Sequence, residues 1–247
     1  MNPIAKRFSD ASRLYDVHAN VQQQVAHVFT QWIAQAWHSD SKPKTVLDLG
    51  CGTGYFTRCL QGAFPDAELM ACDWAPEMLE TAKHHSRHVS FFLGDAANFI
   101  APVNADLIAS SFCMQWLENI AASLEHHLQH CKRLAVAMPC DRSFSLWKQA
   151  HHALGYTNGL HPLPNADALR NTLRGWQAAG RITHWREKTL TFTELHTDGL
   201  AFARNLKAIG AATPKPGHNP VNLRKLVKRL PSPLTVNYEV LFLEVQA

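Results

Sequence analysis

Three glycines at alternate positions follow an apolar run that contains an acidic residue: the segment is Val46-Leu47-Asp48-Leu49-Gly50-Cys51-Gly52-Thr53-Gly54. This pattern predicts a strand, a tight turn and the start of a helix, where backbone N–H groups and the helix dipole can bind a polar ligand. Glycine suits such a turn because a Cβ would block both positive φ angles and close approach of a ligand. Since glycine-rich turns also occur without ligands, the neighbouring residues must decide.

Polar side chains end the next predicted strands. Asp73 ends the apolar run 68–73, Asp95 follows the run 89–93, and Ser111 ends a third run. Because the carboxyl ends of parallel strands meet at one edge of a sheet, these residues should gather beside Gly50. A carboxylate in the position of Asp73 can accept hydrogen bonds from both hydroxyls of a ribose. One acid alone could be a helix cap, but two acids beside the glycine turn favour ligand binding.

An alternation of strands and helices must position these residues. Apolar runs separated by amphipathic segments imply a parallel sheet with right-handed crossovers. Residues 8–37 have apolar side chains at helical spacing and predict two helices, divided near residues 16–20, that could form a lid. The predicted strands are 46–49, 68–73, 89–93, 105–111 and 134–138, and the predicted helices between them are 55–60, 76–84 and 118–130.

The pattern changes after residue 140. Residues 143–180 are typical of helices and loops, and Thr193 is a candidate N-cap for a helix that runs to Gly210. Two late strands predict an antiparallel edge on the parallel sheet, with an inserted helical cap. The remaining predicted elements are a strand at 182–192, a turn at 214–217, a short basic helix at 221–230 and a last strand at 235–245.

We therefore expect a single α/β domain with a mostly parallel sheet, an antiparallel edge and a helical cap. The expected parts are N-terminal lid helices at 1–42, a ligand-binding core at 43–140, the inserted cap at 141–180, and C-terminal strands with substrate-side helices at 181–247.

Composition narrows the class of protein. The chain has 247 residues, of which 46% are hydrophobic, and a formal charge of +4, which suits one large domain that is only mildly basic. No apolar run approaches the roughly 20 residues of a membrane helix. Residues 1–7 lack the apolar core of a signal peptide, so we expect a cytoplasmic protein without a membrane partner. Six cysteines without a CxxC pair indicate buried thiols in a reducing compartment.

Fifteen histidines raise the question of a metal site. The pairs His84/His88 and His126/His130 have the i, i+4 spacing of ligands on one helix face. Neither group has a carboxylate or cysteine at ligand spacing to complete a set. We therefore expect solvated helix faces and no metal.

Together, these residues resemble the S-adenosylmethionine-dependent methyltransferases with a Rossmann-like seven-stranded sheet. The G-x-G-x-G spacing differs from the G-x-G-x-x-G of nicotinamide enzymes. The resemblance covers most of residues 43–140 and implies that S-adenosylmethionine is the cofactor, with Asp73 on the ribose and Asp95 at the adenine amino group. The cofactor-binding residues that it implies are Asp48, Gly50, Cys51, Gly52, Gly54, Asp73, Trp74, Met78, Asp95, Ala96, Ser111 and Phe112.

Segments outside the core are similar to the malonyl-[acyl-carrier protein] O-methyltransferases of biotin synthesis. The match is weak over residues 140–190, and family members often have Tyr where this chain has Val236. The resemblance implies methyl transfer to the free carboxylate of a malonyl thioester, with an acyl carrier protein as partner. The similar segments are residues 8–19 with Gln22, residues 110–116, residues 204–211 and residues 233–236.

The implied reaction needs positioning more than proton transfer. A carboxylate with an ordinary pKa of roughly 4 is already ionised at neutral pH, so no general base is required. The enzyme must instead hold the carboxylate oxygen, the methyl carbon and the sulfonium sulfur in line without bulk water. The candidates for closing and positioning the pocket are Tyr15, His18, Gln115 and Trp116.

Basic residues are candidates for two further roles. A buried anion needs a cationic clamp, for which Arg204 and Lys207 are candidates, although both could be solvated charges on an amphipathic helix. An acidic carrier protein could meet a basic surface, although a run of charges is usually solvated. The candidates for that surface are Arg224, Lys225, Lys228 and Arg229.

Three alternative functions stay open. The acceptor could be a small free carboxylic acid, since trans-aconitate methyltransferase also has a Gln-Trp pair after its fourth strand. The basic charge would suit an RNA methyltransferase, but the basic residues are scattered, so we expect no nucleic-acid partner. A methyltransferase-like scaffold could also bind the cofactor without turning it over.

We expect the protein to be a monomer.

Overall fold

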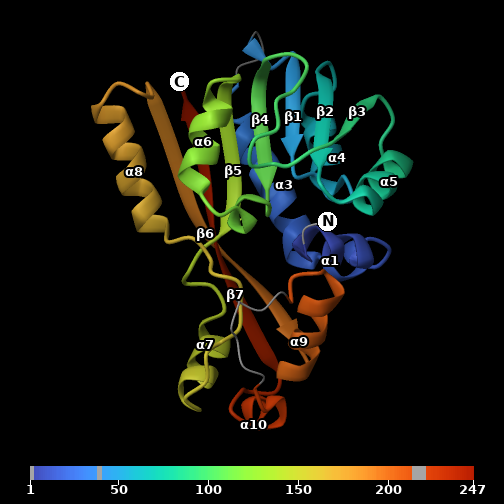
Figure 1. The fold of residues 1–247 in the computed structure, drawn as a ribbon, viewed down its shortest axis with the longest axis vertical. Helices are drawn as coiled ribbons and strands as arrows, with labels where there is room; N and C mark the ends of the chain where they lie inside the picture. The colour runs from blue at the N-terminus through green and yellow to red at the C-terminus, as the bar shows by residue number, and fades with distance from the viewer. Residues whose placement is uncertain (1–2, 38–40, 213–220) are drawn as a thin grey trace.

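The computed structural model describes residues 3–37, 41–212 and 221–247. Within them, one 7-stranded sheet has the order β3-β2-β1-β4-β5-β7-β6. The first five strands are mutually parallel, and β7 runs antiparallel to both β5 and β6, which confirms the predicted fold class (Figure 1). The strands are β1 (Thr45–Leu49), β2 (Glu68–Asp73), β3 (Val89–Leu93), β4 (Ala105–Ser111), β5 (Cys131–Pro139), β6 (His184–His196) and β7 (Leu234–Gln246).

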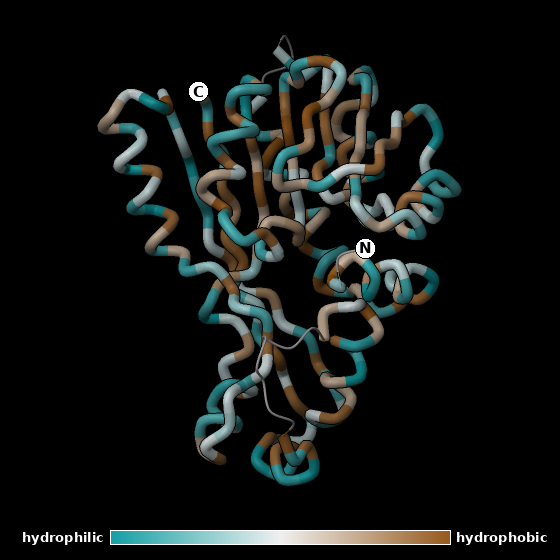
Figure 2. The backbone as a smooth tube through the Cα atoms, viewed as in Figure 1, coloured by the Kyte–Doolittle hydropathy of each residue, from teal (hydrophilic) through white to brown (hydrophobic). Residues whose placement is uncertain are grey.

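Helices cover both faces of this sheet, and the strands between them are largely hydrophobic (Figure 2). One face carries α3 and α4, whose Phe29, Ile33 and Leu60 belong to a buried cluster with strand residues such as Val46. The opposite face carries α6 and α8. The helices are α1 (Pro3–Ala11), α2 (Tyr15–His18), α3 (Asn20–Ala34), α4 (Tyr55–Ala63), α5 (Pro76–His85), the 3-10 helix η2 (Met114–Trp116), α6 (Ile120–Leu128), α7 (Ser145–His152), α8 (Ala166–Ala178), α9 (Gly199–Ala208) and α10 (Leu223–Val227).

The strands of the parallel half agree with the sequence pattern. Predicted strands 68–73, 89–93 and 105–111 are confirmed residue for residue. Strands β1 and β2 lie inside the sheet and are almost entirely buried, as near-continuous apolar runs require when helices cover both faces. Pro76 begins α5, where its missing N–H costs no hydrogen bond.

The N-terminal segment differs from the prediction of two helices. It forms three helices, because the backbone also turns at residues 12–14, where the Leu14 N–H bonds the Ala11 carbonyl. The second break is at Ala19, with φ −91° and ψ 42°, inside the predicted division at residues 16–20. The short helix α2 between these breaks turns Tyr15 toward the sheet edge described below.

The prediction that a helix begins at Thr193 is wrong. Residues 193–196 continue β6 and pair with residues 234–237 of β7, which supplies their backbone hydrogen bonds. The helix begins at Gly199 instead, because the Asp198 side chain accepts a hydrogen bond from the Ala201 N–H at 2.8 Å and caps the first turn. The predicted turn at residues 214–217 lies outside the described residues.

Strands β6 and β7 extend beyond the rest of the sheet. Only residues 240–246 of β7 pair with β5, whereas β6 pairs with β7 along its whole length. The remaining hairpin, residues 191–196 with 234–239, projects below the parallel strands with α7, α9 and α10 around it (Figure 1). We call this part the hairpin arm.

A buried ion cluster fastens the long strands to α3. Glu244 of β7 is 1% exposed, and its two carboxylate oxygens accept hydrogen bonds from Arg133 at 3.1 Å and Arg186 at 2.9 Å. Both guanidinium groups also lie over indole rings, Arg133 on Trp37 and Arg186 on Trp32. The cluster therefore joins β5, β6 and β7 to the C-terminal end of α3.

Candidate active site

The glycine turn forms as the sequence pattern predicts. Gly50 and Cys51 donate their N–H groups to the Cys72 carbonyl at 2.8 and 2.9 Å, which ties the end of β1 to β2. Gly50, Gly52 and Gly54 have φ angles of 77°, 54° and 79°, in the region that disfavours side chains. A Cβ on Gly50 would also overlap the Cys113 Sγ. The turn therefore packs against the loop after β4 and requires glycine there.

Asp73 supports the same turn from the end of β2. Its Oδ2 accepts a hydrogen bond from the Gly52 N–H at 2.9 Å, and its Oδ1 accepts one from the Ala75 N–H at 2.8 Å. Burial raises the pKa of this carboxyl, and the backbone N–H donors oppose that rise. A carboxylate has about four lone-pair sites, so Asp73 can still accept two hydrogen bonds from a ligand.

His127 positions the neighbouring loop after β3, and sequence reasoning missed it. Its Nε2–H donates to the Ala96 carbonyl at 2.8 Å, and burial lowers the pKa of this imidazole to about 4. The expectation of a solvated face is therefore wrong for His127, although His84 and His85 are exposed. The only sequence signal for a buried His127 was its position on the apolar face of the helix predicted at residues 118–130. Among the described residues, no three or more metal-ligand side chains lie close enough together to hold one ion.

Two adjoining cavities lie where α1, α2 and α3 meet the carboxyl ends of the strands. The first, which we call the donor cavity, encloses about 860 Å³ of empty space, including the part open to solvent. The second, the acceptor cavity, encloses about 570 Å³ by the same measure and reaches into the hairpin arm. Both are lined by the same five side chains, which mark the junction between them: Phe8, Tyr15, Gln22, Phe112 and Trp116.

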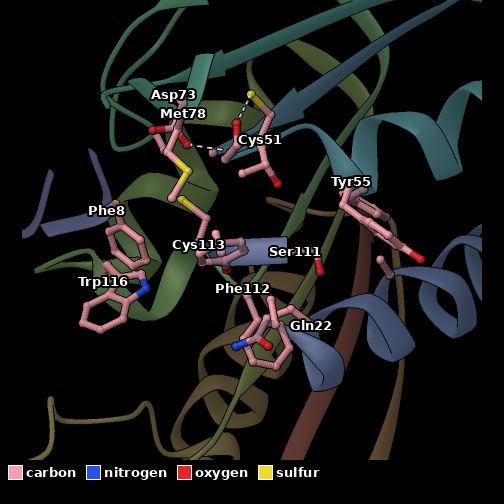
Figure 3. A pocket seen from close by; sticks show the side chains of 18 of the residues that line it. Phe8, Gln22, Cys51, Tyr55, Asp73, Met78, Ser111, Phe112, Cys113 and Trp116 are labelled. Carbon is pink, nitrogen blue, oxygen red and sulfur yellow. Dashed lines mark hydrogen bonds between the residues drawn. The ribbon is translucent and has the colours of Figure 1, made fainter. Parts of the chain in front are cut away.

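The donor cavity brings together most of the predicted cofactor-binding residues (Figure 3). Asp48 and Gly54 are exceptions: Asp48 is buried beneath the turn, and Gly54 is the N-cap of α4. The predicted residues that line the donor cavity are Gly50, Cys51, Gly52, Asp73, Trp74, Met78, Asp95, Ala96, Ser111 and Phe112.

The predicted positioning residues divide between the cavities. Tyr15 and Trp116 lie at the junction, and Gln115 lines the acceptor cavity. The Gln115 Nε2 donates to the Phe112 carbonyl at 2.6 Å, so this side chain holds the loop that carries Phe112. His18 lines neither cavity; it ends α2 beside the junction residue Tyr15.

The predicted cationic clamp is not part of either cavity. Arg204 and Lys207 are exposed on α9, whereas Leu206 and Ile209 of the same segment line the acceptor cavity. The reason is helical phase: the apolar stripe of α9 packs inward, so the cations point to solvent. The predicted carrier-protein residues Arg224, Lys225, Lys228 and Arg229 are also exposed, on and after α10.

The donor cavity fits a ligand with a ribose and an extended polar end. A Cβ built on Gly52 would meet nothing within 4 Å, so open space borders the turn beside the Asp73 carboxylate. Asp95 offers a second carboxylate, while Met78 and Trp74 supply apolar walls. These features suit S-adenosylmethionine.

Asp48 should make folding stability depend on pH. Its Oδ2 accepts a hydrogen bond from Thr57 at 2.6 Å, but its Oδ1 has no partner among the described residues. Burial raises the pKa of this carboxyl to about 7. The folded state therefore keeps a proton that the unfolded state loses above roughly pH 4, so the free energy of unfolding falls as pH rises toward 7, by up to about 4 kcal/mol.

Urea unfolding of the cofactor-free protein near pH 5 and near pH 8 tests this prediction. Asp48→Asn should remove most of the difference between the two conditions and be more stable than wild type near pH 8. An equal loss of stability in wild type and variant would assign the pH dependence to other groups.

Comparison with known proteins shows which family the chain resembles. Residues 46–135 match the family model described as a methyltransferase domain. The biotin biosynthesis bifunctional protein BioCD of Bordetella avium is 33% identical over 228 residues, which cover 90% of this chain and 47% of that protein. The chain therefore spans about half of that relative. The malonyl-[acyl-carrier protein] O-methyltransferase of Neorickettsia risticii is 29% identical, covering 97% of this chain and 94% of the relative.

Solved structures share the fold. The plantazolicin methyltransferase BpumL in complex with SAH aligns with a TM-score of 0.59 and 16% identity, covering 98% of this chain and 93% of that one. No helix in the described part of the chain has both the length and the hydropathy to cross a membrane. The Neorickettsia risticii relative has the name of the family that the sequence motifs resemble. In the structure, the G-x-G-x-G turn, Asp73 and Asp95 border one cavity. The chain therefore has a methyltransferase domain and the fold of S-adenosylmethionine-dependent methyltransferases, and S-adenosylmethionine is its cofactor.

Proposed function

We propose that this protein transfers a methyl group from S-adenosylmethionine to the free carboxylate of malonyl-acyl carrier protein, giving the malonyl methyl ester used in biotin synthesis. The observation that supports it most strongly is similarity to a malonyl-[acyl-carrier protein] O-methyltransferase over 97% of the chain. The two adjoining cavities are consistent with it, because an acyl group in one can reach a donor in the other.

The cofactor supplies an electrophilic methyl group when it is bound. In this proposal, Asp73 binds the ribose hydroxyls, Asp95 meets the adenine amino group, and the glycine turn borders the methionine part. Asp73 can do so without moving, because the Gly52 and Ala75 N–H groups already fix its carboxylate. The His127 bond to the Ala96 carbonyl holds the adenine side of the cavity in place.

The junction residues would align the acceptor and exclude water. Phe8 packs edge-on against Trp116, with ring centroids 5.4 Å apart. The ring centroids of Phe8 and Tyr15 are 6.4 Å apart. These rings come from α1, α2 and η2, so they close the junction from two sides. The malonyl carboxylate is ionised at neutral pH and needs no general base. Holding it in line at close range can lower the barrier by roughly 7–11 kcal/mol.

The proposal includes an encounter with an acidic carrier protein in the cytoplasm. Leu226 is the buried residue of α10, so the cations of this helix face outward and could contact acidic side chains. We further propose that the protein acts as a monomer.

Incubation with methyl-labelled cofactor and malonyl-acyl carrier protein tests the function. Label should appear on the carrier as a base-labile methyl ester. Acetyl-acyl carrier protein, which lacks the free carboxylate, is the matched control and should stay unlabelled. Equal labelling of both carriers, or labelling of free malonate at the same rate as the malonyl carrier, would refute the proposed acceptor.

A further inference from the structure

Four polar side chains at the edge of the two cavities have hydrogen-bonding groups that the protein does not use. Tyr15, Gln22 and Trp116 line both cavities, and Ser111 lines the donor cavity beside them. The Tyr15 hydroxyl, the Gln22 amide, the Trp116 indole N–H and the Ser111 hydroxyl have no hydrogen-bond partner among the described residues. All four side chains are partly exposed at the cavity walls, so these groups are accessible to a ligand.

The hydrogen-bonding groups of Gln22 and Trp116 point toward the same space. In Figure 3 the Trp116 indole nitrogen and the Gln22 amide both turn toward the space between the two side chains, and Ser111 lies at the end of β4 above Gln22. Gln22 is on α3 and Trp116 ends η2, so two separate elements present donors to one space. The ring of Trp116 is held between Phe8 at 5.4 Å and His161 at 4.8 Å, which fixes the direction of its N–H.

Neither cavity has a lysine or arginine among the described residues that line it. The donor cavity instead contains three carboxyl groups, those of Asp16, Asp73 and Asp95. The imidazole that lines the acceptor cavity, His161, gives its Nε2–H to the Gln115 carbonyl at 3.0 Å. A ligand at the junction therefore meets neutral donors on one side and negative charge on the other.

We propose that the acceptor carboxylate is bound at the junction by neutral donors, chiefly the Gln22 amide and the Trp116 indole N–H with the Tyr15 hydroxyl, and not by a cation. This inference rests on the proposed function and names the residues that read its substrate. Hydrogen bonds from neutral groups hold a carboxylate in place but withdraw less charge from the attacking oxygen than a guanidinium would. Once the carboxylate is methylated, its charge is gone and these bonds weaken, which favours release of the ester.

The same arrangement selects the class of acceptor. The walls of the acceptor cavity are mainly apolar, including Leu160, Leu163, Leu206 and Ile209, so a second carboxylate there would lose its hydration without gaining a partner. Repulsion from the aspartates of the donor cavity adds to that cost. The site therefore takes an acyl group with one carboxylate on a neutral chain, such as a malonyl thioester, and discriminates against free di- and tricarboxylic acids.

Steady-state kinetics with malonyl-acyl carrier protein tests the inference. Gln22→Leu and Trp116→Phe should each lower kcat/KM by about 10- to 100-fold, mainly through KM, because each removes one hydrogen bond to a charged group. Gln22→Glu should lose more, since it places a like charge beside the carboxylate. Calorimetric affinity for S-adenosylhomocysteine should stay within about threefold of wild type, which shows that the variants fold and bind the donor.

Gln24→Leu is the matched control, because Gln24 is exposed on the same helix and lines neither cavity. If wild type esterifies the malonyl carrier but Gln22→Leu and Trp116→Phe keep its KM, the inference fails while the function stands. A larger rise in KM for Arg204→Gln than for Gln22→Leu would assign the carboxylate to a cation and also overturn it. A wild-type enzyme that does not esterify the malonyl carrier would refute both.

Discussion

Asp73→Asn is expected to weaken binding of S-adenosylmethionine by at least 100-fold, measured by titration calorimetry. The carboxylate is fixed by the Gly52 and Ala75 N–H groups, so two lone-pair sites can serve the ribose hydroxyls. Hydrogen bonds to a charged acceptor contribute roughly 1.5–3 kcal/mol each, and asparagine offers one neutral oxygen with an N–H₂ group in place of the other. The loss of two such bonds accounts for the expected change.

The loss should come from binding and not from unfolding. Burial raises the pKa of Asp73, which means that its charge costs stability in the cofactor-free protein. In Asp73→Asn the loss of the buried charge is opposed by an N–H₂ group that faces one of the two backbone donors, so the variant should still unfold cooperatively, at a urea concentration close to that of wild type. Asp66→Asn, at an exposed position, is the control. An Asp73→Asn variant that kept wild-type affinity would refute the proposed cofactor site.

Glu244→Leu is expected to destabilise the fold by about 3–5 kcal/mol, because it leaves two partly buried arginines without their carboxylate. Arg133 and Arg186 retain their bonds to the Ala36 and Trp32 carbonyls at 3.1 and 2.8 Å, but these neutral acceptors do not balance two charges. Urea unfolding, followed by circular dichroism, measures the change in free energy.

A compensating variant separates the charge effect from a packing effect. Replacing Arg133 and Arg186 by methionine together with Glu244→Leu should recover most of the lost stability, since no charge is then left unpaired. Glu118→Leu, at an exposed position, should change the free energy of unfolding by less than about 0.5 kcal/mol. If Glu244→Leu were equally mild, the ion cluster would have no structural role.

The parallel half of the sheet was predictable from sequence because each strand is a short, largely apolar run with a polar residue at or just after its end. Asp73 and Asp95 follow directly from their strands, and chain direction alone brings them to one edge. The glycines were predictable because their positive φ angles are a local requirement. These inferences needed no long-range contact.

Features that depend on distant partners could not be predicted. Thr193 has the residue type of an N-cap, but pairing with Asn237 of β7 overrides that preference. Arg204 and Lys207 lie in a segment similar to the family motif, yet the packing of Leu206 decides which face of α9 points inward. Glu244 stands inside an apolar strand, where nothing local shows that Arg133 and Arg186 balance its charge.

The hairpin arm has a consequence for how acceptor choice could be changed. Its Tyr238 and the α9 residues packed on it line the acceptor cavity, whereas the donor cavity is built from the N-terminal helices and the parallel strands. The hairpin arm thus contributes to the wall of the acceptor cavity but not to that of the donor cavity. Grafting the segment from β6 to β7 between related methyltransferases should therefore change which acyl chains are accepted, while the recipient's own residues continue to hold the carboxylate and to recruit the methyl source.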